Sequence, residues 1–157
     1  MNSSPHVNAK DSPALQLRHD MVRAKIAAYS GGLGSVRRVF KNNPKSPAAQ
    51  YGVAISQFLR GKTKNALTII DRLIKQQPKN AYLYEMKAEM LLRGRRANDG
   101  VKYMQKAIAL DPYKSGMLRI QYGHLLLETG KKANAKKAIK QIKAGLARDP
   151  KTVSGYA

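Results

Sequence analysis

The chain has 157 residues, a length that suits one compact domain or one short array of helical repeats. Apolar residues make up 43% of it and charged residues 25%, both near the averages of globular proteins, so a folded chain is expected. Cysteine is absent, which excludes a disulfide framework, thiol catalysis and thiolate metal sites.

The net charge is unusual for a globular chain. Thirty Lys and Arg residues against nine Asp and Glu residues give a formal charge of +21. One interpretation is an acidic or polyanionic partner, such as nucleic acid, an anionic membrane surface or an acidic protein. The other is a lysine-rich, solvated surface without a partner, which the scatter of the cations along the whole chain favours.

The two ends of the chain differ in character from its middle. Residues 1–12 are expected to form a flexible segment, and they lack the charged and apolar regions of a signal peptide. Residues 151–157 are expected either to begin a further helix or to form a truncated end. No run approaches the roughly 20 apolar residues that a membrane-spanning helix requires, so no membrane span is expected.

Between these ends the apolar residues recur with the period of a helix. Ala66, Ile70, Leu73 and Ile74, for example, follow the i, i+4, i+7, i+8 spacing of one buried face. Glycines that can adopt a left-handed cap lie between paired helices, at Gly61, Gly94 and Gly130. No strand pattern is present, so an all-α fold is predicted. The expected helices span residues 13–29, 33–42, 47–60, 63–76, 81–93, 97–110, 115–128 and 133–148.

Two regular spacings indicate that the helices form repeats. Proline, which ends helices, recurs at intervals of 34, 34 and 38 residues, at Pro44, Pro78, Pro112 and Pro150. Twelve residues before each proline stands a small residue, which would let two helices approach closely: Gly32, Ala66, Gly100 and Ala138. Both spacings together predict a repeating pair of helices.

These residues resemble the tetratricopeptide repeat, a 34-residue helix pair with small residues at fixed positions and a closing proline. The matching segments are 47–80, 81–114 and 115–150, preceded by a degenerate pair at 13–44. The aromatic positions of the pattern depart from it, at Gln50, Arg119, Gln57 and Leu91. The resemblance covers residues 13–150 and implies a superhelical solenoid of antiparallel helix pairs that binds proteins.

A narrower resemblance concerns the segments 11–25 and 84–92. Their order is similar to the C-terminal tetratricopeptide tail of bacterial zinc metalloproteases, periplasmic proteins with an HExxH active site. None of the histidines here (His6, His19 and His124) begins that motif, so the chain itself is expected to have no catalytic residues, no zinc and no cofactor. The resemblance implies a periplasmic location for such a tail; otherwise the cytoplasm is expected.

The family's groove positions give the candidate binding residues. In a tetratricopeptide array the first helix of each pair lines a concave groove, and the corresponding residues here are Tyr51, Ile55, Phe58, Tyr82, Glu85, Glu89, Leu92, Met117, Ile120, His124 and Leu127. Aromatic, aliphatic and acidic groups suit an extended or helical peptide with apolar anchors. The alternative is that Tyr51, Tyr82 and Met117 only pack against neighbouring helices.

The sequence therefore predicts a protein-protein interaction module that is not an enzyme, with a protein or peptide as its partner and no specific nucleic acid. An alternative of another class is a basic helical-repeat protein that binds RNA or an anionic membrane surface. The position of the charge separates the two, because phosphate binding requires Lys and Arg along the groove. Lys132, Lys136, Lys137, Lys140 and Lys143 are instead expected on the outer side of the last helix.

Overall fold

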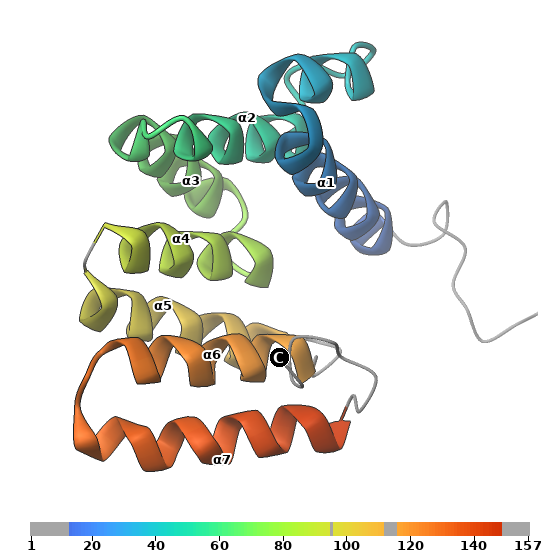
Figure 1. Ribbon diagram of the computed structural model, residues 1–157. Helices are drawn as coiled ribbons and strands as arrows, with labels where there is room; N and C mark the ends of the chain where they lie inside the picture. Colours follow the sequence, from blue (N-terminus) through green and yellow to red (C-terminus); the bar gives the residue numbers. More distant parts are fainter. Residues whose placement is uncertain (1–12, 95, 112–115, 149–157) are drawn as a thin grey trace, which may run out of the picture. The chain divides into compact units, whose positions relative to one another are not determined.

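The computed structural model describes residues 13–94, 96–111 and 116–148 (Figure 1). This part of the chain contains no strand, which confirms the all-α prediction. Its helices are α1 (Pro13–Val39), α2 (Pro47–Leu59), α3 (Thr63–Gln76), α4 (Ala81–Arg93), α5 (Ala97–Leu110), α6 (Gly116–Glu128) and α7 (Lys132–Arg148). None of these helices is long and apolar enough to cross a membrane.

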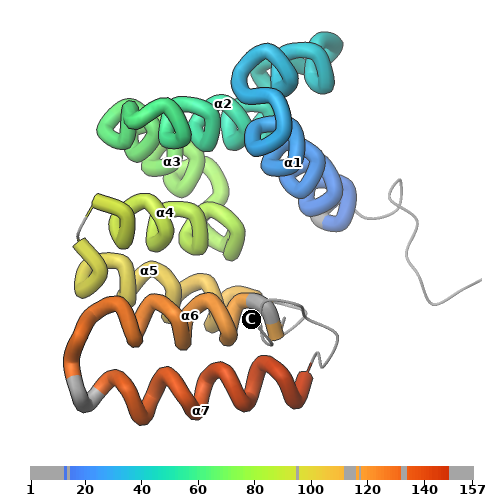
Figure 2. The backbone as a smooth tube through the Cα atoms, viewed as in Figure 1, coloured from blue at the N-terminus to red at the C-terminus, as the bar shows by residue number. Residues whose placement is uncertain are grey.

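The first two predicted helices form one element, α1, which is interrupted at Gly32. That residue has φ 65° and ψ −154°, a conformation that glycine adopts without a steric penalty, and the helix changes direction there. The change of direction is visible in the blue part of the tube in Figure 2. A Cβ atom added at Gly32 would meet nothing within 4 Å, so the expected close helix contact at this residue is wrong. Gly32 serves the bend instead.

The chain divides into two compact units, Met1–Ile69 and Ile70–Ala157, and the boundary falls within α3. In the first unit α1 packs along α2. Gly52 of α2 permits the approach, because a Cβ atom there would lie 2.8 Å from Val36 Cγ1 and 3.2 Å from Ala24 Cβ. The hydroxyl of Ser46 caps α2 by accepting a hydrogen bond of 3.2 Å from the Ala49 N–H.

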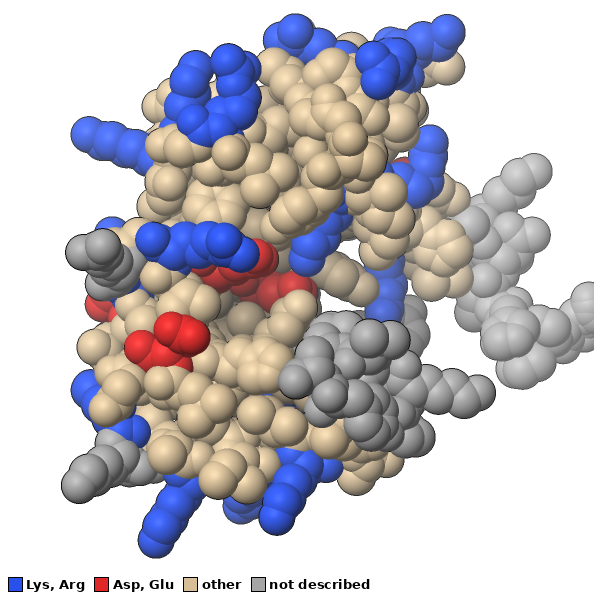
Figure 3. Space-filling model, in the orientation of Figure 1, with Lys and Arg blue, Asp and Glu red and all other residues tan. Residues whose placement is uncertain are grey.

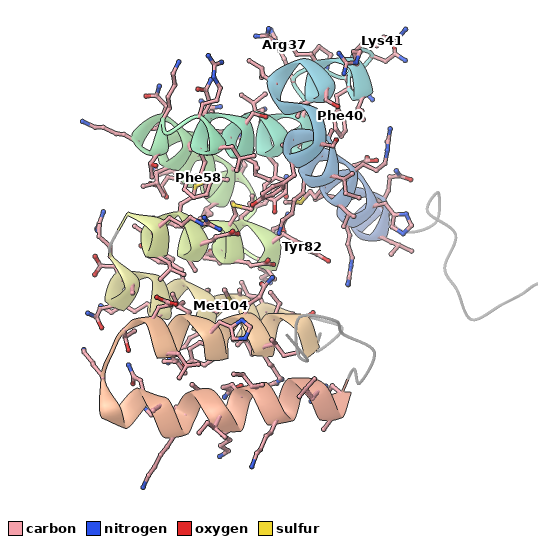
Figure 4. All side chains as sticks on the ribbon, in the orientation of Figure 1. Arg37, Phe40, Lys41, Phe58, Tyr82 and Met104 are labelled. Atoms are coloured by element: carbon pink, nitrogen blue, oxygen red, sulfur yellow. The ribbon has the colours of Figure 1, made fainter. Side chains whose placement is uncertain are left out.

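In the second unit α4 packs against α5, α6 packs against α7, and α5 contacts α6. The shared core consists of Tyr84, Ala88, Met104, Ala107, Leu118, Tyr122, Leu125, Leu126 and Ala138, of which Met104 is labelled in Figure 4. The hydroxyl of Tyr84 donates a 2.8 Å hydrogen bond to the carbonyl of Pro78, which ties the start of α4 to the turn before it.

Small residues allow the helices of each pair to approach closely, as the spacing predicted. A Cβ atom at Gly100 would lie 2.9 Å from the carbonyl oxygen of Ala88, and one at Gly123 would lie 2.9 Å from that of Ala138. The second contact repeats the first in the next helix pair. Gly61 and Gly130 have the expected positive φ, of 83° and 70°. Gly94 does not: it ends α4 with a right-handed φ of −81°.

Candidate functional site

The binding residues predicted in the first unit belong to its core. The exposed fractions of Tyr51, Ile55 and Phe58 are 1%, 0% and 8%. Their helix, α2, is buried on most of its circumference, because Ala48, Ala49, Gly52, Ala54 and Ser56 are buried as well. Side chains with so little surface cannot contact a peptide without rearrangement. All three residues pack in the core, which is the alternative considered for Tyr51.

In the second unit the predicted residues of α4 form a continuous stripe. Tyr82, Glu85, Glu89 and Leu92 follow i, i+3, i+7, i+10 spacing, which places them on one side of the helix. Tyr82 lies in the first turn of α4, where its backbone N–H donates a 3.1 Å hydrogen bond to the capping side chain of Asn80 (Figure 4). Tyr82, Glu89 and Leu92 are half-buried, whereas Glu85 is 5% exposed.

The carboxylate of Glu89 is the most accessible acid of this stripe. Its side chain is 27% exposed and pairs at 3.9 Å with Arg93, whose own side chain is 67% exposed. An ion pair of that length in contact with water contributes little free energy, on the order of 0–1 kcal/mol.

Lys87, the lysine in the middle of α4, lies away from this stripe. Its ammonium group contacts the carboxylate of Asp71 at 2.7 Å and lies 4.3 Å from the ring centroid of Tyr103. Burial by itself would lower the pKa of Lys87, but the hydrogen bonds to Asp71 and Tyr103 outweigh burial and raise that pKa above its ordinary value of 10.5. The ammonium group of Lys87 is thus held by residues of α3 and α5.

Helix α6 contributes a second set of accessible residues. His124 and Glu128 are exposed, and Leu127 is 48% exposed. Ile120 is fully buried, so its predicted place in the groove is wrong: it faces α7, where a Cβ atom added at Gly145 would lie 2.6 Å from its Cγ1 atom. The side chain of Met117, which was also predicted to bind, lies outside the described residues.

We name the stripe of α4 together with the accessible residues of α6 the α4–α6 face. It comprises Tyr82, Glu85, Glu89, Leu92, His124, Leu127 and Glu128, and the two helices that carry it contact each other. Figure 3 shows acidic side chains gathered over α4 and near α6, whereas the lysines over α7 project outward at the lower edge. The exposed cations of α7 are Lys136, Lys137, Lys140, Lys143 and Arg148. The α4–α6 face contains none of these cations.

A surface in the first unit was not foreseen from the sequence. Val22, Ile26 and Tyr29 of α1 are 42%, 62% and 47% exposed. In the sequence, Leu15, Val22 and Tyr29 are seven residues apart, as are His19 and Ile26, and this spacing could have indicated the surface. The apolar residues on the opposite side of the same helix made the spacing hard to recognise.

Metal binding has no comparable support, because the described residues contain no group of three His, Asp or Glu side chains that could hold an ion.

No protein-family model and no curated protein matches the chain. Several solved structures are similar to it in fold. A thermophilic tetratricopeptide protein of Thermus thermophilus, TTC0263, superposes with a TM-score of 0.59 at 17% identity, covering 89% of this chain and 93% of its own. MamA of Desulfovibrio magneticus has a TM-score of 0.61 at 18% identity, with 92% and 81% covered.

A third structure, YrrB, is described as a tetratricopeptide protein with an unusual peptide-binding site. It has a TM-score of 0.57 at 18% identity and covers 94% of this chain and 70% of its own. At these identities the similarity concerns the fold. The chain has an all-α fold of tetratricopeptide-like helix pairs, as its spacing of prolines and small residues predicted.

Proposed function

We propose that the chain is a protein-protein interaction module that binds a peptide on the α4–α6 face. The observation that carries this proposal is the combination of acidic and apolar side chains on this face. The most accessible acids of α4 and α6, Glu89 and Glu128, lie on the same face as an exposed leucine, although the whole chain has a formal charge of +21. Peptide-binding grooves combine apolar contact area with a few polar groups that fix orientation.

The face favours a particular kind of peptide. Leu127, at 48% exposure, offers the main apolar contact, and Tyr82 and Leu92 add half-buried surface. Glu89 then accepts a Lys or Arg side chain in place of Arg93. We therefore expect an extended or helical segment with an apolar anchor next to a cation. A phosphate backbone is disfavoured here, since Glu85, Glu89 and Glu128 would repel it.

The test compares peptide binding by two variants with matched controls. A peptide array is probed at near-physiological salt, and the best ligand is titrated by fluorescence anisotropy. Glu89→Lys and Leu127→Ser are each expected to weaken binding about tenfold, which is roughly 1.4 kcal/mol. Asp99→Lys changes an exposed acid of α5 that pairs with Arg96 at 2.9 Å, and Ile139→Ser changes an isoleucine of α7 that is 53% exposed. Both controls should bind as the unmodified chain does.

Two results would contradict the proposal. One is a peptide whose affinity is unchanged in both Glu89→Lys and Leu127→Ser. The other is a preference for acidic peptides over basic ones on the array, because such a preference would place the binding surface among the cations. Far-ultraviolet circular dichroism of each variant shows whether the helices are retained.

A more specific part of this proposal is that the module is the tail, or a remnant, of a zinc metalloprotease and presents substrates or partners to it. Its support is the similarity of the segments 11–25 and 84–92 to such tails. A gene that lies directly upstream and encodes HExxH would support it. A neighbouring gene without that motif, together with no copurification of a protease, would count against it.

One observation favours the alternative function, a basic module that binds RNA or an anionic membrane surface. Residues 21–70 contain nine Lys and Arg residues and no acid, and residues 129–148 contain seven and no acid. The exposed lysines of α7 belong to the second stretch. A salt titration separates this function from peptide binding, because binding to phosphates weakens steeply as the salt concentration rises.

A further inference from the structure

Helix α1 has two apolar sides, of which one is buried and the other is largely exposed. Met21, Ala24, Ala27 and Ala28 are at most 4% exposed and form the side that belongs to the core of the first unit. Val22, Ile26 and Tyr29 lie on the opposite side and are 42%, 62% and 47% exposed. They are three of the seven large exposed apolar residues in the described part of the chain, and such clustering marks interaction surfaces.

The exposed residues, together with the half-buried Leu15, have the spacing of a helix-packing seam. Leu15, Val22 and Tyr29 are seven residues apart, and so are His19 and Ile26, so the steps along this side alternate between four and three residues. At about 3.6 residues per turn these five positions fall within a strip roughly 80° wide. We call them the outer seam. A strip of this width is typical of contact with a single helix, while helices that lie in a bilayer interface have a broader apolar face.

Cations flank the outer seam on both sides. Arg18 and Lys25 occupy one edge, and Arg23 occupies the other. The one acid in the described part of α1, Asp20, accepts from Arg23 at 3.2 Å and from the Gln16 amide at 3.0 Å, and it lies toward the back of the helix. In helix pairs the residues at these flanking positions select the partner by their charge. The flanks of the outer seam therefore suit a partner with acidic flanks.

We propose that the outer seam docks a single amphipathic α-helix of another protein, one with an apolar seam and with Asp or Glu along its flanks. A second copy of this chain is disfavoured by charge. Two such seams would bring Arg18 and Lys25 against like charges. Residues 1–69 contain eleven Lys and Arg residues and two Asp residues, so the first unit of each copy has a net charge of +9. This site is separate from the α4–α6 face, so either proposal can fail without the other.

The test uses designed three-heptad peptides and the full chain. The first peptide has Leu and Ile in its seam and Glu at all flanking positions. The second has Lys at those positions, and the third is a scrambled version of the first. Binding is measured by fluorescence anisotropy at near-physiological salt. We expect only the Glu peptide with the ordered seam to bind, and Ile26→Asp to weaken that binding at least tenfold.

Two further variants make the result specific to the outer seam. Ile139→Asp introduces the same change at an isoleucine of α7 with 53% exposure, and it should leave binding unchanged. The double variant Arg18→Glu/Lys25→Glu should lose the Glu peptide and gain the Lys peptide. Tyr29→Ser provides a second seam variant should Ile26→Asp lose its helical circular dichroism.

Four results would overturn the proposal. The first is equal binding of the ordered and scrambled Glu peptides, which would show that charge alone attracts them. The second is binding of the Lys peptide by the unmodified chain. The third is a dimer in sedimentation equilibrium that Ile26→Asp abolishes. The fourth is Ile26-dependent binding to vesicles of phosphatidylcholine and phosphatidylglycerol by a chain that does not bind the Glu peptide.

Discussion

At the scale of single residues, the clearest polar arrangement is the contact of Lys87 with Asp71 and Tyr103. The ammonium group lies 2.7 Å from the carboxylate of Asp71 and 4.3 Å from the ring centroid of Tyr103. The lysine side chain is 16% exposed and Asp71 is 48% exposed, so solvent screens the pair in part. Three helices, α3, α4 and α5, are joined by this one cation. Its effect on stability should depend on pH.

The first prediction concerns the substitution Lys87→Met. The pKa of Lys87 is raised in the folded chain, so its contribution to the free energy of unfolding is fully present below pH 10.5 and is lost as the pH rises further. We expect the variant to be less stable by about 1 kcal/mol near pH 8. Urea denaturation at several pH values should show this difference shrinking above pH 10.5.

The matched control is Lys106→Met, which removes an exposed lysine from α5. Its effect on the free energy of unfolding should be small, because exposed side chains away from specific contacts rarely matter. If Lys87→Met costs no more than this control, or if its cost grows with pH above 10.5, the assignment of a stabilising ion pair to Lys87 is wrong.

At the scale of the helices, close packing depends on positions where a methyl group has no space. A Cβ atom at Gly100 would meet the backbone carbonyl of Ala88, which cannot rotate away. At Gly34 in α1 the nearest atom would be Arg38 Nη1 at 3.7 Å, the end of a flexible side chain. Two glycines in helices are thus expected to respond to the same substitution with opposite signs.

The second prediction follows from this difference. Alanine is the better helix former by about 0.8–1 kcal/mol, so Gly34→Ala should stabilise the chain. Gly100→Ala should instead lower the free energy of unfolding by about 1–3 kcal/mol, because the helices α4 and α5 must move apart. Thermal and urea denaturation of both variants test it. Stabilisation by Gly100→Ala would show that these helices are packed less closely than described.

The sequence predicted the helices well because their signals are local. The span 81–93 was predicted with the bounds of α4, and 63–76 with those of α3, since glycine, proline and capping residues mark those ends. The site was predicted less well. Tyr51 and Ile120 occupy groove positions of the pattern, yet they are buried, because burial depends on which neighbouring helices cover them. Periodicity alone does not carry that information.

At the scale of the whole molecule, the acids are distributed unevenly along the chain. Residues 70–157 contain seven of the nine acids, and residues 1–69 contain two. Within the second unit, Figure 3 shows acidic side chains over α4 and basic side chains that project from the lower edge, over α7. In the first unit Arg37 and Lys41 extend outward at the end of α1 (Figure 4). Cations on several separate surfaces attract polyanions without selecting a sequence.

The last prediction uses salt to separate such attraction from peptide binding. Each phosphate neutralised on single-stranded RNA contributes about −0.7 to the slope of log K against log salt, so six contacts give a slope near −4. We expect a generic RNA to bind at low salt and to lose orders of magnitude in affinity near physiological salt. A peptide held by Leu127, Tyr82 and Leu92 should lose much less, since apolar contacts are not screened.

Two double variants assign the RNA contacts. Lys136→Gln/Lys140→Gln removes two exposed cations of α7, and Lys102→Gln/Lys106→Gln removes two exposed cations of α5. Each pair that contacts RNA should make the slope less negative by about 1.4, and neither should change the affinity for a peptide. Sequence-selective RNA binding that persists at physiological salt and is lost in Glu89→Lys or Leu127→Ser would refute the peptide-binding proposal. In that case the α4–α6 face would be the nucleic-acid site, in spite of its carboxylates.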